Sequence, residues 1–305
     1  MIKLGVFGKH EKANQLIGEL EGVEEMQLIG YYNPSSSDIR HNDSDTLTTF
    51  QSVDDLLLHS DVIYIAELGC NLFETANLAF RNTKHVFIEQ ISGLSLDEVE
   101  TLLNHSKEAN VKCVIGSSEL SHPAFIYLQE LSTKPHFIET QRQLVCEEAQ
   151  EADIIFDLMI KDIAMILQLA KSDMKRIMVK GDCLFSNQID LLSARLEFAN
   201  GCIANLLVNT AAWQTRSKMM VYEKGKMMSA DFIENKVKYT LIDQNDASYV
   251  DTIVFTESAS SRFQIENFKN HLLYNTPAML SLRAGYEKLV VANQISEKIN
   301  HLPEE

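Results

Sequence analysis

The sequence predicts an α/β protein with two domains: a doubly wound parallel sheet in residues 1–120, and an α/β domain with an open, largely antiparallel sheet in residues 121–305. Three observations support this prediction. The chain has 305 residues, which exceeds a typical single domain. Its first third alternates short apolar segments with segments typical of helices. From about residue 136, strand-like segments follow one another closely, which favours a second domain.

The apolar segments of the first domain have the length and character of buried parallel strands. Helices are expected between them, and Ser95 and Glu98 have the spacing of a capping box that opens one of these helices. Right-handed crossovers make such a sheet doubly wound, and ligands then bind at the carboxyl ends of its strands. The predicted strands are residues 3–8, 26–33, 61–67, 85–90 and 111–117.

The second domain is predicted to be an antiparallel sheet with a helix packed on it. The helix is the apolar run from Ile154 to Leu169. Asn200-Gly201 is a strong two-residue hairpin signal, and Gly225 marks another turn. Residues 276–300 are predicted to form an amphipathic helix that packs back on the body.

Composition narrows the class of protein and of partner. The formal net charge of −16 argues against a nucleic-acid partner, because a phosphate backbone requires a concentrated basic face. No apolar run reaches about 18 residues without charges, so no membrane span is predicted. The N-terminus lacks the layout of a signal peptide, and the 5 cysteines form no CxxC pair, which favours reduced thiols in the cytoplasm over disulfides or a metal site.

The chain resembles the glucose–fructose oxidoreductase / inositol dehydrogenase (Gfo/Idh/MocA) family along nearly its whole length. The resemblance implies a Rossmann-type domain that binds NAD or NADP, and a second domain whose open sheet often makes a dimer. It also implies a sugar, nucleotide sugar or inositol as substrate, bound in a cleft between the domains. The segments that keep the family's order and spacing are LIGYYNPS, HVFIEQISGLSLDEVETL, ELSHPAF, FDLMIKDIAMIL and ARLEFANGCIANL.

The phosphate-binding fingerprint of the family is altered. The motif GxGxxG reads GKHEKA from Gly8, so His10 and Ala13 stand at the second and third glycines. The second glycine lets the backbone approach a diphosphate, and the His10 side chain is therefore expected to occupy that space. Lys9 and Lys12 flank the turn and could still hold an anion. The sequence favours the alternative, a plain strand–helix turn that is capped internally, because the structural context of the fingerprint is present while its glycines are not.

Further positions that the resemblance assigns to the cofactor and to the reacting hydroxyl also differ. Asn33 stands where an acidic residue usually accepts from the ribose hydroxyls, and Glu67 and Leu72 follow the next strand. The motif EKP reads Glu89, Gln90 and then isoleucine. Gln90 can hold a hydroxyl by hydrogen bonds, but it cannot titrate, so general acid–base work at this position is lost. The cofactor contacts expected by resemblance are thus Gly8, Lys9, His10, Asn33, Glu67 and Glu89.

The catalytic motif DLMIHDID reads DLMIKDIA, with Lys161 in place of the histidine and Ala164 in place of the last acid. Three roles for Lys161 remain open. It could form an ion pair with Asp157, four residues earlier on the helix. It could hold the substrate as a cation without proton chemistry. It could also act as the base of the active site, with Gln90 and Asp157 beside it.

These changes favour a member of the fold that has lost catalysis but keeps the cleft for a sugar-like ligand, a nucleotide or a protein partner. The alternative is an active NAD(P)-dependent oxidoreductase of a sugar, nucleotide sugar or inositol-like substrate, with Lys161 as acid and base. A third hypothesis is a subunit that assembles, through its open sheet, with a second copy or with an active homologue. No metal site is predicted.

Overall fold

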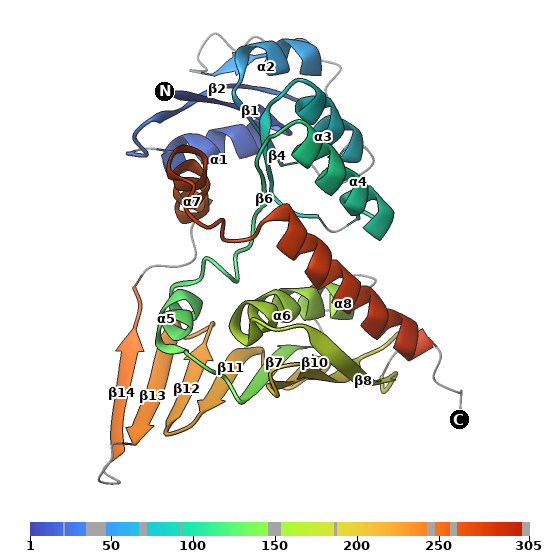
Figure 1. The fold of residues 1–305 in the computed structure, drawn as a ribbon, viewed down its shortest axis with the longest axis vertical. Helices are drawn as coiled ribbons and strands as arrows, with labels where there is room; N and C mark the ends of the chain where they lie inside the picture. Colours follow the sequence, from blue (N-terminus) through green and yellow to red (C-terminus); the bar gives the residue numbers. More distant parts are fainter. Residues whose placement is uncertain are drawn as a thin grey trace. The chain divides into compact units, whose positions relative to one another are not determined.

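In the computed structural model the chain divides into two compact units, each with a sheet of its own (Figure 1). Unit 1 comprises Met1–Ser118 and Ser260–Tyr286, and unit 2 comprises Glu119–Ala259 and Glu287–Glu305. The fold is α/β, with a parallel sheet in unit 1 and a mixed sheet in unit 2, which confirms the predicted class. The structure describes residues 1–20, 22–34, 47–66, 72–91, 93–145, 154–185, 188–242, 248–256 and 261–300.

The sheet of unit 1 has 6 strands in the order β3-β2-β1-β4-β5-β6, all of them parallel to their neighbours. This is the order of a doubly wound nucleotide-binding sheet, in which the direction of winding reverses between β1 and β4. Ligands of such sheets bind outside the carboxyl ends of the strands at this point. The strands are β1 (Ile2–Phe7), β2 (Met26–Tyr32), β3 (Thr48–Thr49), β4 (Val62–Ile65), β5 (His85–Ile88) and β6 (Cys113–Ile115).

Helices connect these strands, and the predicted capping box opens one of them. The Ser95 hydroxyl accepts from the Glu98 amide at 3.3 Å, and the Glu98 carboxylate accepts from the Ser95 amide at 2.7 Å. Two helix-start donors are therefore satisfied by side chains. The helices of this unit are α1 (His10–Leu20), α2 (Val53–His59), α3 (Leu72–Arg81), α4 (Leu96–Glu108) and α7 (Ser261–Tyr274).

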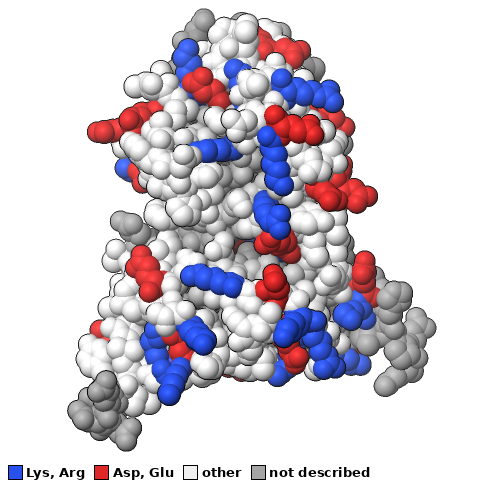
Figure 2. Space-filling model, viewed as in Figure 1, with Lys and Arg blue, Asp and Glu red and all other residues white. Residues whose placement is uncertain are grey.

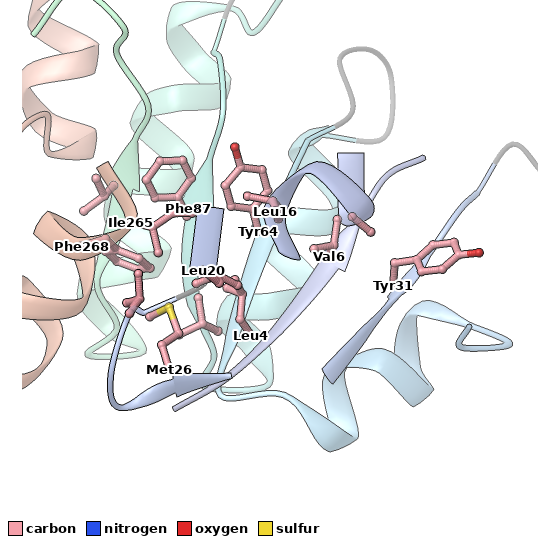
Figure 3. Close-up of a cluster of buried hydrophobic side chains, with 14 residues drawn as sticks. Leu4, Val6, Leu16, Leu20, Met26, Tyr31, Tyr64, Phe87, Ile265 and Phe268 are labelled. Atoms are coloured by element: carbon pink, nitrogen blue, oxygen red, sulfur yellow. The ribbon is translucent and has the colours of Figure 1, made fainter. Parts of the chain in front are cut away.

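Helix α7 comes from late in the chain and completes the core of unit 1 (Figure 3). Phe268 is 1% exposed, and its ring lies 5.6 Å from that of Phe87 on β5. The predicted division at residue 120 does not provide for this return of the chain, and no helix was predicted between residues 261 and 275. The pattern of α7 is weakly amphipathic, because Ile265 and Phe268 are its only buried residues among those described.

The sheet of unit 2 has 8 strands in the order β14-β13-β12-β11-β7-β10-β9-β8, and only β7 and β10 run parallel among these pairs. Both predicted turns are present, because Gly201 (φ 87°) joins β9 to β10 and Gly225 (φ 72°) joins β11 to β12. Positive φ values of this kind favour glycine. The strands are β7 (Phe137–Val145), β8 (Met174–Asp182), β9 (Leu191–Phe198), β10 (Ile203–Ala212), β11 (Arg216–Glu223), β12 (Lys226–Asp231), β13 (Lys236–Ile242) and β14 (Ser248–Val254).

Helix α6 (Ile154–Ala170) packs on the sheet of unit 2, as the apolar run predicts, and α5 (Pro123–Leu131) lies beside β12 and β13. The last helix, α8, spans Leu282–Asn300, so the prediction that it begins at residue 276 is wrong. The Ser281 hydroxyl accepts from the Ala284 amide at 3.2 Å and caps the helix. Within the described ranges, no helix combines the length and apolar character that crossing a membrane requires.

Cysteine placement and surface charge agree with an ordinary globular chain. Cys113 and Cys202 are buried and free, whereas Cys183 is free and exposed; Cys70 and Cys146 lie outside the described residues. Burial raises the pKa of the Cys202 thiol to about 11, so this thiol stays protonated at neutral pH. On the face shown in Figure 2, acidic and basic side chains are interspersed.

Candidate functional site

The carboxyl edge of the sheet in unit 1 brings together several of the residues predicted to contact a cofactor. Gly8 to Lys12 follow β1, and Glu89 and Gln90 follow β5. At this edge Lys12 Nζ lies 2.5 Å from Glu89 Oε1, with 18% and 32% of the two side chains exposed. Lys12 and Glu89 lie far apart in the sequence, and the parallel register of β1, β4 and β5 makes them neighbours.

Tyr64, on β4, lies beneath this ion pair. Lys12 Nζ is 5.9 Å from the centre of the Tyr64 ring, which stacks on Phe87 at 4.9 Å. Burial, together with the neighbouring Glu89 carboxylate, raises the pKa of Tyr64 well above its usual value. The phenol therefore keeps its proton. Figure 3 shows the Tyr64 hydroxyl at the end of the buried cluster.

His10 has a defined place at the start of α1. Its Nε2 lies 2.7 Å from the Asn14 amide nitrogen, and its ring is tilted against that of Tyr31 on β2, with centroids 5.1 Å apart. These contacts hold the imidazole on the side of α1 that is next to β2. The idea that His10 crowds a bound diphosphate stays a prediction.

The remaining predicted cofactor contacts are spread along the same edge. Lys9 is exposed, and its carbonyl accepts from the Lys12 amide at 3.1 Å. Asn33 follows β2, Gln90 is exposed, and Glu67 lies outside the described residues. Leu72, on α3, is buried and belongs to the hydrophobic core.

The residues present fit the diphosphate of a dinucleotide, although not through the full glycine fingerprint. Gly8 keeps the first glycine of that fingerprint at φ 155°, and its amide donates to the Tyr32 carbonyl at 2.9 Å. Lys12 supplies a cation one helical turn later. The second glycine is replaced by His10, whose ring is held by Asn14 and Tyr31 as described. This edge can therefore receive an anion through Lys12.

In unit 2, Lys161 is paired with a residue that the sequence analysis did not single out. Its Nζ lies 3.7 Å from Glu119 Oε1, with 42% of the Lys161 side chain and 16% of the Glu119 side chain exposed. Asp157, the expected partner, is exposed and lies one turn earlier on α6. Lys161 is thus a partly exposed cation on α6 with a carboxylate beside it.

A buried ion pair lies next to Lys161 in the sequence. Arg142 on β7 donates to Asp162 Oδ1 through Nε at 3.0 Å and through Nη2 at 2.7 Å, with 12% and 3% of the side chains exposed. Burial alone would lower the pKa of Arg142, but the Asp162 carboxylate outweighs it and the pKa is raised. A signal for this pair exists in the sequence, because Asp162 interrupts an apolar helix and Arg142 shares a strand face with buried Ile138 and Thr140.

Two further titratable groups face the Glu119 carboxylate. Burial lowers the pKa of Lys288, on α8, to about 8, and Glu119 partly opposes this shift. Burial also lowers the pKa of His122, whose ring caps α5 by accepting from the Ala124 amide at 3.2 Å. Glu119, Lys161, Arg142, Asp162 and Lys288 form a group that we call the Glu119 cluster.

The Glu119 cluster can hold and protonate a polar ligand. Lys161 is its most exposed cation, and an ammonium group can donate to a carbonyl, an alkoxide or a phosphate oxygen. In the part of the chain that the structure describes, no three His, Cys, Asp or Glu side chains are placed to hold a metal ion.

Comparison with known proteins finds dehydrogenases among the relatives of this chain. No protein-family model matches the sequence. The chain is 25% identical to UDP-N-acetylglucosamine 3-dehydrogenase of Acidithiobacillus ferrooxidans over 256 residues, which is 81% of each chain.

Solved structures show the same likeness over the whole fold. UDP-N-acetylglucosamine 3-dehydrogenase GnnA from Acidithiobacillus ferrooxidans superposes with a TM-score of 0.84 at 22% identity, covering 98% of this chain and 97% of that one. The dehydrogenase MviM from Clostridium difficile superposes with a TM-score of 0.77 at 16% identity, covering 98% and 99%. The structural neighbours of this chain are thus Gfo/Idh/MocA-type dehydrogenases, and the chain has their fold.

Proposed function

We propose that this chain is an NAD(P)-dependent oxidoreductase acting on a nucleotide sugar or a related polyol, with Lys161 as the acid–base residue. The observation that supports this most strongly is the Glu119 cluster. It keeps a partly exposed lysine, held by a carboxylate, at the position where the resemblance places a catalytic histidine. Buried and half-buried charges are costly unless they are paired or used, so an organised cluster at this position favours a working site.

The residues of this chain have separate tasks in the proposed reaction. Lys12 holds the diphosphate of the cofactor in unit 1, and Gln90 binds a hydroxyl without transferring its proton. Lys161, paired with Glu119, carries a proton that it can donate to the carbonyl oxygen of a keto sugar as that oxygen gains charge. The nicotinamide, when bound, supplies or accepts the hydride. In the oxidation direction, Lys161 must first release its proton.

Binding of the cofactor is tested by thermal unfolding with NAD⁺, NADH, NADP⁺ and NADPH, because a ligand that binds only the folded state raises Tm. A screen of UDP-sugars in the presence of the stabilising nucleotide then identifies the substrate. Turnover is followed by the absorbance of the reduced nicotinamide. If no nicotinamide nucleotide raises Tm, the proposal fails.

The proposed role of Lys161 is tested by Lys161→Gln, which keeps a polar side chain only one atom shorter and removes the ionisable ammonium group. We expect kcat to fall about a hundredfold or more, since general acid–base catalysis contributes this much. The dissociation constant of the cofactor should stay unchanged. Lys175→Gln, at an exposed position on β8, is the matched control. Full turnover by Lys161→Gln would remove Lys161 from the mechanism.

Ligand binding without turnover is the second candidate function. It is favoured by Gln90, which cannot titrate where the resemblance places a lysine. Nucleotides or sugars would then raise Tm without any turnover in either direction. The likeness to dehydrogenases supports an enzyme that turns over its substrate as the first candidate.

A further inference from the structure

The ion pair between Lys12 and Glu89 spans the carboxyl edge of the sheet in unit 1. Lys12 lies in the first turn of α1, directly after β1, and Glu89 directly follows β5. Strand β4 lies between β1 and β5 in the sheet, so the pair crosses above β4, where Tyr64 supports it. This edge, at the change in winding direction, is where doubly wound sheets receive diphosphates.

The Glu89 carboxylate makes with Lys12 the contact that a diphosphate oxygen would make. Carboxylate and phosphate oxygens are both anionic acceptors for an ammonium group, and both form short charge-assisted hydrogen bonds with it. Lys12 Nζ has only one further acceptor among the described residues, Gln15 Oε1 at 3.4 Å. The Tyr64 ring lies under the ammonium group, and both partners of the pair are partly shielded from water.

We infer that Lys12 is the residue that binds the diphosphate of a nucleotide in unit 1, and that Glu89 competes with this ligand for the ammonium group. Binding then exchanges one anionic oxygen for another at Lys12 Nζ. The inference rests on the proposed function, and it names the residues that set the affinity for the nucleotide.

The competition makes opposite predictions for the two partners. Removing the Glu89 charge frees Lys12 and also removes a like charge from the neighbourhood of the diphosphate, so affinity should rise. Removing the Lys12 charge leaves Glu89 unneutralised at the same edge, so affinity should fall. The formal net charge of −16 gives no general attraction for an anion, and a local cation therefore matters more here than it would in a basic protein.

The test measures ADP binding by calorimetry, because ADP carries the diphosphate without the nicotinamide. We expect Glu89→Gln to bind ADP about tenfold more tightly than the unaltered chain, and Lys12→Gln about tenfold more weakly. Lys12→Arg, which keeps the charge, should bind within about threefold of the unaltered chain. In the Lys12→Gln background, the gain from Glu89→Gln should shrink, since the carboxylate then has no ammonium group to occupy.

Matched controls separate this local effect from a change in net charge. Lys107→Gln and Glu100→Gln make the same charge changes at exposed positions of α4 in the same unit. Neither should alter ADP affinity. Thermal unfolding of every variant shows whether it is folded. If Lys12→Gln does not fold, the test rests on the ADP affinities of Lys12→Arg and Glu89→Gln, which should be nearly unchanged and higher, respectively.

Failure of the inference can be told apart from failure of the proposed function. If ADP affinity depends on Lys12 and Glu89 as stated but no nicotinamide nucleotide binds, the inference stands and the proposed function fails. If NAD(P)H binds and turns over but the Lys12 and Glu89 variants bind ADP like the unaltered chain, the inference is overturned alone. Absence of ADP binding to every variant, Glu89→Gln included, overturns it as well.

Discussion

At the scale of single residues, Lys288 shows how burial changes a charge that the sequence alone presents as ordinary. Its pKa is lowered to about 8 by burial in unit 2, against about 10.4 for a free lysine. The folded chain therefore disfavours the charged form. This penalty is fully present below pH 8, and it disappears as the pH rises from 8 to above 10, where the unfolded chain also loses the proton.

We expect Lys288→Met to stabilise the folded chain by about 2 kcal/mol at pH 7, because it removes a buried charge and keeps the apolar stem. The advantage should shrink above pH 8 and vanish above about pH 10.4, the pKa of an unperturbed lysine. Denaturant unfolding of both proteins at several pH values measures the difference. Lys298→Met, at an exposed position of the same helix, should show neither effect. A difference that stays constant with pH would contradict the lowered pKa.

At the scale of elements, α4 illustrates a boundary that local chemistry determines. The Ser95 hydroxyl and the Glu98 carboxylate satisfy each other's backbone amides at its start. We expect Ser95→Ala to lower the free energy of unfolding by about 1 kcal/mol, since one amide at the helix start loses its acceptor. Ser95→Thr keeps the hydroxyl and should cost little. Urea unfolding measures both, and equal stability of the two variants would mean that the cap contributes nothing.

Helices that depend on distant contacts behave differently. The helix predicted from residue 276 begins at Leu282, and α7, which precedes it, was not predicted. The α7 pattern is weak because only Ile265 and Phe268 are buried among its described residues. Its place is fixed by the apolar surface of β5 and α1, which lie far away in the sequence.

At the scale of the whole molecule, Phe268 ties the late part of the chain to the first unit. We expect Phe268→Ala to lower the free energy of unfolding of unit 1 by about 3–5 kcal/mol, because it leaves a cavity beside Phe87. Amide exchange should speed up in β4 and β5 and stay unchanged in β9 and β10. Phe263→Ala should cost much less, because this residue of the same helix is 40% exposed. Equal loss of protection in both sheets would show that the two units unfold together.

The sequence alone predicts the α/β class, five of the six strands of the first sheet (all but the two-residue β3), both glycine turns of the second sheet and the capping box of α4. These features depend on residues close together in the chain, where periodicity and turn chemistry suffice. The sequence also singles out Lys161, because a lysine is unusual within an apolar helical segment. Its partner Glu119 lies more than forty residues earlier and belongs to no local pattern.

Which charged side chains form ion pairs depends on how distant elements pack. Lys12 reaches Glu89 because parallel register aligns the ends of β1, β4 and β5, and Arg142 reaches Asp162 because α6 packs on β7. Neither pairing can be derived from spacing along the chain, since each depends on how distant elements pack. The same reason explains why residues 261–286 complete unit 1: the apolar surface that they cover exists only after the sheet and α1 have come together.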